Sequence, residues 1–105
     1  DLKNALYLNI SNADFKISDE IKKSGLNSDY FRRCFKEEMG KTPLEYYTDL
    51  KIRTAKKLLL EQSFVSVECT AEKCGYTDSF YFSKVFKSCT GLSPLNYRKK
   101  YMKNY

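Results

Sequence analysis

Apolar residues recur every three or four positions along most of the chain, which is the spacing of helices that bury one face. In the first segment they fall at i, i+3, i+4 and i+8, as Leu2, Ala5, Leu6 and Ile10. No segment alternates apolar and polar residues in the way that a half-buried strand would. The pattern therefore predicts an all-α fold.

Turn and capping residues divide the chain into further helices. The clearest start is Thr42-Pro43-Leu44-Glu45, where Thr42 suits the N-cap, Pro43 the first helical position, and Glu45 can reach back to the cap. We expect this helix to continue to about Gln62, a length of about 27 Å. Serines are expected to begin three other helices, at Ser18, Ser66 and Ser93. Glycines are expected to end helices or turn the chain at Gly25, Gly40, Gly75 and Gly91.

A stretch in the first half of the chain recurs 51 residues later. Residues 27–47 read NSDYFRRCFKEEMGKTPLEYY, and residues 78–98 read DSFYFSKVFKSCTGLSPLNYR, with nine of 21 positions identical. The identical pairs are Ser28/Ser79, Tyr30/Tyr81, Phe31/Phe82, Phe35/Phe86, Lys36/Lys87, Gly40/Gly91, Pro43/Pro94, Leu44/Leu95 and Tyr46/Tyr97. Such self-similarity indicates one structural unit built twice. Each copy follows a short helix and a glycine turn, which is the helix-turn-helix order.

The longer helix of each copy has an apolar inner face and a polar outer face. The inner residues are Phe31, Cys34 and Phe35 in the first copy and Phe82, Val85, Phe86 and Cys89 in the second. A helix of this kind fits the major groove of DNA, where each base pair displays a distinct set of donors and acceptors. The residues predicted to reach base edges are Asp29, Arg32, Arg33, Ser79, Phe80, Ser83 and Lys84. Those predicted to contact phosphate are Lys36, Lys41, Thr42, Lys51, Arg53, Lys87, Ser93 and Arg98.

Each of these assignments has a simpler alternative. A basic face opposite a core is often only solvated. Phe80 is equally consistent with the edge of the core, or with an isolated exposed apolar residue. Asp29 either accepts a hydrogen bond from a cytosine amino group or sits at a helix N-terminus because a carboxylate is favoured there.

The net charge of +6, from 19 basic and 13 acidic residues, favours an anionic partner. A length of 105 residues fits one domain, or two very small ones that share a helix. Histidine is absent, and no zinc spacing or phosphate-binding glycine loop is present. We therefore assign no catalytic residue, metal ligand or cofactor, and predict that the chain is not an enzyme. No apolar run is long enough to span a membrane.

The four cysteines do not follow a metal-binding or disulfide pattern. They are Cys34, Cys69, Cys74 and Cys89. We interpret them as small apolar residues on the inner faces of helices. A redox-sensitive pair formed by Cys69 and Cys74 is the alternative.

Taken together, these segments resemble the DNA-binding domain of the AraC/XylS family of bacterial transcription regulators. The resemblance is carried by Gly75–Lys87, Gly91-Leu92-Ser93-Pro94 and Tyr97-Arg98, by Lys51–Ala55 with Leu58-Leu59, and by Phe35-Lys36, Gly40 and Pro43. It covers nearly the whole chain and implies seven helices. Two helix-turn-helix subdomains, at about residues 1–42 and 63–105, would be joined by a linker helix at about 43–62. The chain departs from the family pattern at Glu20 and Ile21, at Lys51 and at Asp29.

The resemblance implies a sequence-specific domain that binds double-stranded DNA in the cytoplasm. Its two recognition helices would enter successive major-groove segments about one turn apart. It also implies a ligand-sensing or dimerisation domain N-terminal to this one. RNA polymerase is a further candidate partner, and no membrane association is expected. The alternative function is a helical protein-interaction module that docks a partner through exposed Tyr and Phe residues.

Overall fold

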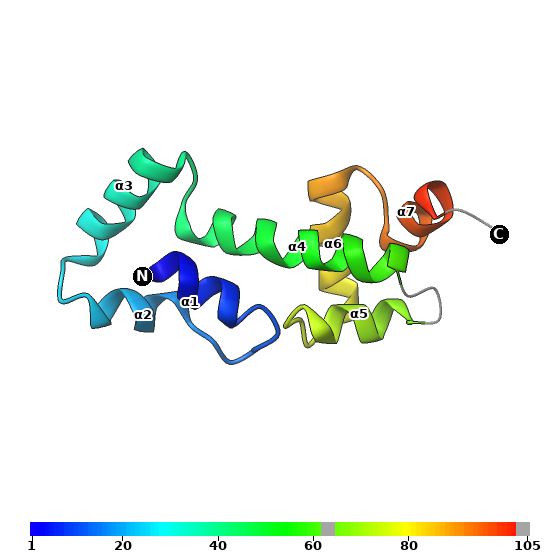
Figure 1. Ribbon diagram of the computed structural model, residues 1–105, viewed down its shortest axis with the longest axis horizontal. Helices are drawn as coiled ribbons and strands as arrows, with labels where there is room; N and C mark the ends of the chain where they lie inside the picture. The colour runs from blue at the N-terminus through cyan, green and yellow to red at the C-terminus, as the bar shows by residue number, and fades with distance from the viewer. Residues whose placement is uncertain (62–64, 103–105) are drawn as a thin grey trace.

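The computed structural model describes residues 1–61 and 65–102, and these residues form seven α-helices and no strands (Figure 1). The helices are α1 (Leu2–Leu8), α2 (Ile17–Lys23), α3 (Ser28–Met39), α4 (Pro43–Glu61), α5 (Val67–Lys73), α6 (Ser79–Thr90) and α7 (Pro94–Tyr101). The predicted all-α fold is thus confirmed. Gln62, the expected last residue of the long helix, lies outside the described residues.

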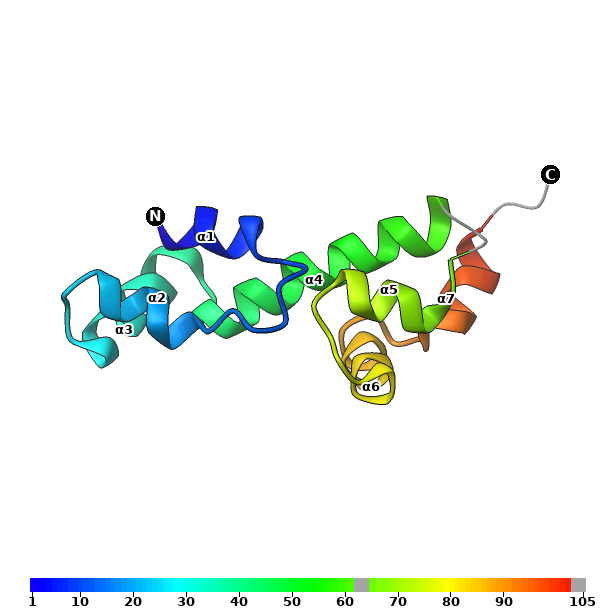
Figure 2. The ribbon, with the colours of Figure 1, turned by 90° about the horizontal axis from the view of Figure 1, so that it is seen from below.

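The long helix α4 forms the axis of an elongated molecule measuring 51 × 24 × 22 Å. Helices α1, α2 and α3 gather at one end of it, and α5, α6 and α7 at the other (Figures 1 and 2). Helix α4 packs against helices of both groups, α1 and α3 on one side and α5, α6 and α7 on the other. Each group is too small to bury much apolar surface alone, so α4 supplies part of both cores.

Local capping interactions explain where most helices begin. At the start of α4 the Thr42 hydroxyl accepts a hydrogen bond from the Glu45 amide, and the Glu45 carboxylate accepts one from the Thr42 amide. This is the predicted capping box, and the hydrogen bond that the Thr42 amide donates to the carboxylate lowers the pKa of the Glu45 carboxyl. Ser66 and Ser93 cap α5 and α7 as expected.

Helix α2 begins earlier than its sequence suggested. It starts at Ile17, Lys16 occupies the N-cap position without a side-chain hydrogen bond, and Ser18 lies inside the helix. The prediction of Ser18 as the cap was therefore wrong. Starting at Ile17 places this side chain one turn before the buried Ile21 on the same face. Apolar packing at this point outweighs the hydroxyl cap.

Helix α1 is shorter than the apolar pattern indicated. It ends at Leu8, and Ile10 lies in the turn that follows rather than on the helix. The Asn9 side chain donates to the carbonyl of Ala5 at 2.8 Å, which satisfies one of the last acceptors of the helix. The side-chain amide thus favours a helix end at this residue.

The two copies of the sequence repeat have matching structures. Gly40 and Gly91 both end their helices with a positive φ, of 77° and 86°. In each copy, an edge-to-face aromatic pair joins the helix before this glycine to the helix after it. The ring centroids of Phe35 and Tyr46 are 5.7 Å apart, and those of Phe86 and Tyr97 are 5.3 Å apart. The self-similarity therefore reflects one structural unit formed twice.

The larger core lies in the second half. Its buried residues are Ile52, Ala55, Leu59, Ala71, Cys74, Phe82 and Phe86. Among the cysteines, Cys74 is buried, Cys34 and Cys69 are half-buried, Cys89 is exposed, and all four are free thiols. The prediction that Cys89 faces the core was wrong. It borders a shallow depression lined by Asp49, Arg53 and Lys56 of α4 together with Ile52, so most of its neighbours there are polar.

Candidate nucleic-acid interface

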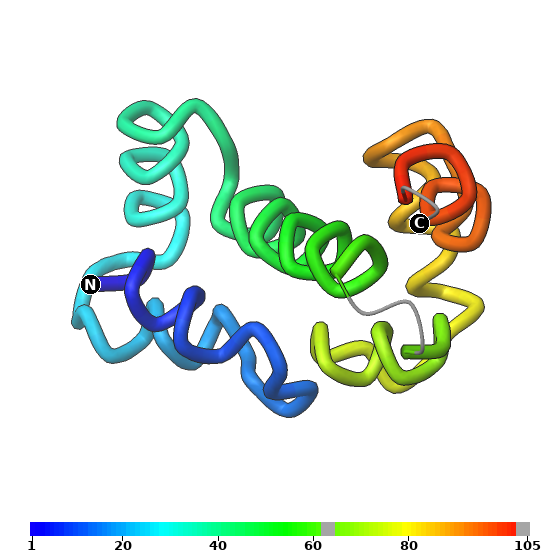
Figure 3. Tube along the Cα trace, turned by 45° about the vertical axis from the view of Figure 1, so that its right-hand side comes forward, coloured from blue at the N-terminus to red at the C-terminus, as the bar shows by residue number. Residues whose placement is uncertain are grey.

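Helices α3 and α6 lie in opposite halves of the molecule, and both run upward in Figure 1. Figure 3 shows the same pair standing on either side of α4. Helix α3 packs against α2 and α4, and α6 packs against α4, α5 and α7. Phe35 anchors the inner face of α3, while Phe82 and Phe86 anchor that of α6. Each longer helix is thus held from behind, with its opposite face open.

The open face of α3 carries three of the predicted DNA-contacting residues in exposed positions, Asp29, Arg33 and Lys36. Arg32 is half-buried, and its Nε donates to the Ser28 hydroxyl at 3.3 Å. The Arg33 guanidinium lies 5.8 Å from the centroid of the Tyr30 ring. Arg33 is therefore the better placed of the two arginines to reach a base edge.

The open face of α6 combines an aromatic ring with cations. Phe80 is 82% exposed, which removes the alternative that it belongs to the core edge. Lys84 and Lys87 are exposed, and Ser79 and Ser83 are half-buried beside them. The Asp78 carboxylate accepts hydrogen bonds from the amides of Phe80 and Tyr81 at 2.9 and 3.3 Å, so it caps α6.

Some of the predicted phosphate-contacting residues are exposed beside these helices. Lys36, Lys41, Arg53 and Lys87 are all exposed, although Lys41 forms an ion pair with Asp49. The hydroxyls of Thr42 and Ser93 accept hydrogen bonds from the amides of Glu45 and Asn96, and so serve as helix caps.

Two other predicted phosphate contacts are instead engaged inside the protein. The Lys51 ammonium lies 4.3 Å from the Tyr47 ring centroid and 4.8 Å from that of Tyr76, and burial lowers its pKa. The Arg98 guanidinium donates to the carbonyl of Leu59 at 2.8 Å and to that of Val65 at 2.6 Å. Both cations thus hold parts of the fold together.

Replacing Arg98 by methionine is expected to lower the free energy of unfolding by about 1–2 kcal/mol. The substitution keeps an apolar side chain but leaves the carbonyls of Leu59 and Val65 without this donor. Urea denaturation followed by circular dichroism measures the loss, and Lys99→Met, at an exposed position of the same helix, is the control. An unchanged stability together with a flatter salt dependence of DNA binding would instead identify Arg98 as a phosphate contact.

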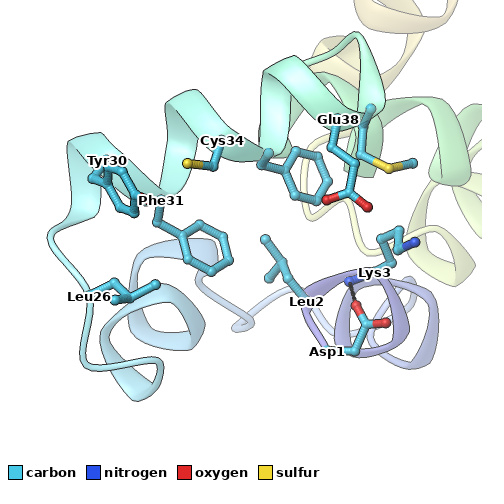
Figure 4. Close-up of a pocket in the computed structure, with 10 residues that line it drawn as sticks. Asp1, Leu2, Lys3, Leu26, Tyr30, Phe31, Cys34 and Glu38 are labelled. Carbon is cyan, nitrogen blue, oxygen red and sulfur yellow. Dashed lines mark hydrogen bonds between the residues drawn. The ribbon is translucent and has the colours of Figure 1, made fainter.

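A hollow of about 510 Å³ separates the start of α1 from α3 (Figure 4). Leu2, Leu26, Tyr30 and Phe31 contribute much of its apolar lining, with Asp1, Lys3 and Glu38 on the α1 side and at the far end of α3. The sequence predicted Phe31 and Cys34 on the inner, apolar face of their helix. They are half-buried because α1 does not close against α3 at this point.

Within the described residues, no cluster of three or more Cys, Asp or Glu side chains is arranged to hold a metal ion. Nor does that part of the chain contain a helix long and apolar enough to cross a bilayer.

Comparison with known proteins identifies the domain. Residues 21–100 match the family model of a helix-turn-helix domain. The HTH-type transcriptional activator RhaR of Mannheimia succiniciproducens is 35% identical over 102 residues, which are 97% of this chain and 36% of that protein. The chain belongs to the AraC/XylS family. It corresponds to the AraC-type helix-turn-helix DNA-binding domain of that family of transcription regulators.

Solved structures of AraC-type domains share the fold. The C-terminal domain of AraT, a response regulator from Geobacillus stearothermophilus, aligns with a TM-score of 0.90 at 26% identity, over 98% of this chain and 84% of that one. The DNA-binding domain of AdpA, solved in complex with a target DNA, aligns with a TM-score of 0.85 at 23% identity, over 95% of this chain and 88% of that one. The chain spans about a third or less of the length of the curated AraC/XylS relatives that it matches.

Proposed function

We propose that this AraC-type domain reads double-stranded DNA by sequence, as part of a bacterial transcription regulator. Residues 1–42 and 63–105 act as two DNA-reading subdomains, and the helix at about 43–62 joins them. The observation that carries the proposal is the pair of helices α3 and α6. They run in the same direction in Figure 1, and each has its anchored face inward and its polar face open.

The dimensions of the molecule support simultaneous binding by both helices. Recognition helices that enter the groove on one face of DNA, one turn apart, are about 34 Å from each other. The long axis of this molecule measures 51 Å, and its 19-residue central helix is about 28 Å long. Helix α3 lies beyond the start of that central helix and α6 packs on its second half (Figure 1), so a separation of this order fits within the length of the molecule.

The exposed residues supply the chemistry of base reading. Arg33, with Arg32 beside it, can donate two parallel hydrogen bonds to a guanine edge, and Phe80 can contact a thymine methyl group. The remaining base contacts are assigned to Asp29, Ser79, Ser83 and Lys84. Lys36, Lys41, Arg53 and Lys87 and the starts of α4 and α7 neutralise phosphates. Lys51 and Arg98 have no part in this proposal because their charged groups are engaged within the fold.

Related proteins support both the partner and the context. AdpA, whose DNA-binding domain was solved with a target DNA, has the same fold. Relatives about three times as long, such as RhaR, support a further domain in the complete protein, and the matched domain of AraT is C-terminal in its protein. We assign a ligand-sensing or dimerisation role to that further domain, a cytoplasmic location to the regulator, and RNA polymerase as a candidate contact.

A salt titration tests DNA binding against the alternative of a protein-interaction module, which the adjacent exposed residues Tyr7 and Leu8 of α1 favour. Neutralising about six phosphates should lower the affinity for duplex DNA by about 10³ between roughly 50 and 200 mM salt, through counterion release. An affinity that stays level over this range would contradict electrostatic DNA binding and support apolar docking.

A further inference from the structure

The two halves of the molecule touch through a glycine that has no room for a side chain. Gly75 lies between α5 and α6, in a connection that passes next to the turn that follows α1 (Figure 1). A Cβ atom on Gly75 would lie 2.5 Å from the carbonyl oxygen of Ile10 and 3.3 Å from the Lys51 ammonium. Gly25, in the equivalent turn before α3, has a similar φ of +75° against +80°, yet nothing lies within 4 Å of its Cβ position. The close packing around Gly75 is therefore not a general property of such turns, because the equivalent turn at Gly25 lacks it.

A half-buried cation lies beside the same contact. Lys51 projects from α4, and its ammonium lies over the ring of Tyr47, on the same helix, and over that of Tyr76, which follows Gly75. Among residues 1–61 and 65–102, no carboxylate oxygen lies within 4.0 Å of this ammonium. The faces of the two tyrosine rings therefore stabilise this charge from within the protein.

Both tyrosines extend the contact toward a helix-turn-helix unit. The Tyr47 hydroxyl donates to the carbonyl of Asn9 at 2.6 Å, and its ring packs edge-on against Phe15 at 5.6 Å, just before α2. The Tyr76 ring packs against that of Phe82, on α6, at 5.3 Å. A continuous set of contacts thus runs from the α1–α2 connection through Lys51 to α6.

We propose that Lys51 and Gly75 fix the position of α3 relative to α6, and so determine which separation of half-sites the domain accepts. We call this contact, formed by residues 9–11, Tyr47, Lys51, Gly75 and Tyr76, the junction. Lys51 is then a positioning residue that does not touch DNA. This inference rests on the proposed reading of DNA by both helices.

The geometry of DNA makes half-site separation a sensitive measure of such a junction. One inserted base pair moves the second half-site by about 3.4 Å and turns it by about 35° around the helix axis. A protein whose two halves are held firmly must give up contacts at one half-site. A protein with a loose junction can follow the displaced half-site, and keeps more of its affinity.

The experiment measures binding to duplexes that carry the site selected by the wild-type chain, with its half-sites at the selected separation or moved by one base pair in either direction. We expect the wild-type chain to lose about tenfold or more in affinity with each displacement, as for a mismatched contact. Lys51→Met keeps the apolar stem and removes the charge, and should reduce this loss to about threefold or less. Lys51→Arg keeps a cation over the rings and should behave as the wild type.

Gly75→Ala and Gly25→Ala form a matched pair, because both place a side chain at nearly the same positive φ. Only Gly75→Ala should loosen the dependence on half-site separation. Where Gly75→Ala does not fold, Lys51→Met decides the outcome.

Two results would overturn the junction while leaving DNA reading intact. One is a Lys51→Met chain whose affinity falls by the same factor for duplexes of every half-site separation. The other is a wild-type chain whose affinity does not depend on half-site separation. A wild-type chain that selects no duplex would overturn the proposed function and, with it, the effect on half-site separation. In that case ¹⁵N relaxation of the free chains still tests the contact itself. Halves that tumble together in the wild type and separately in Lys51→Met retain the junction as a structural clamp, and identical tumbling rejects it.

Discussion

Replacing Phe86 by alanine should lower the free energy of unfolding by about 3–5 kcal/mol, the usual cost of emptying an aromatic site in a core. The Phe86 side chain is fully buried on α6. It packs against Phe82 at 5.8 Å and edge-on against Tyr97 at 5.3 Å, so its removal leaves a cavity bordered by rings. Urea denaturation followed by circular dichroism measures the loss.

Phe35→Ala is the matched control, because Phe35 occupies the same position in the first copy of the repeat. Its ring packs edge-on against Tyr46, but it is 9% exposed and borders the open hollow between α1 and α3. We therefore expect a smaller loss, of about 1–3 kcal/mol, since part of the site already faces solvent. A loss at Phe35 equal to that at Phe86 would contradict the view that the second half contains the principal core.

Arg33→Ala should weaken binding to the selected duplex by about 1–3 kcal/mol and relax the preference at one base pair. The reason is that Arg33 is exposed on the open face of α3, where its guanidinium can form two hydrogen bonds to a guanine edge. Competition binding with single-base variants of the site measures the change. Binding to random duplex should be much less affected.

Lys87→Ala is the contrasting substitution at the exposed end of α6. It should weaken binding to the selected duplex and to random duplexes by the same factor. It should also reduce the slope of log affinity against log salt by about one unit. Equal losses on both kinds of DNA for Arg33→Ala as well would contradict the division between base-reading and phosphate-contacting residues.

Features fixed by neighbouring residues could be predicted from the sequence. The start of α4 follows from the reciprocal hydrogen bonds of Thr42 and Glu45. The end of α3 follows from Gly40, whose φ of 77° suits a residue without a side chain. The bounds of α3, Ser28–Met39, follow from a cap, an apolar face and a terminal glycine that all lie within one short segment.

Features that depend on distant residues could not be predicted in this way. Lys51 and Arg98 resemble ordinary surface cations in the sequence. Their partners are Tyr76 in one case, and the carbonyls of Leu59 and Val65 in the other, and only the folded chain brings them together. Cys89 is the opposite case. Its helical spacing predicted a position in the core, but the packing of α6 on α4 leaves it exposed. The contact of Gly75 with Ile10 likewise joins the two halves of the chain.

Selection of binding sites from random duplexes tests the central claim most directly, because both helices must contribute to the result. The structure predicts a two-part site whose halves are centred about one helical turn, or roughly 10 base pairs, apart. Enrichment of a single short site, or of no sequence at all, would contradict joint reading of DNA by α3 and α6.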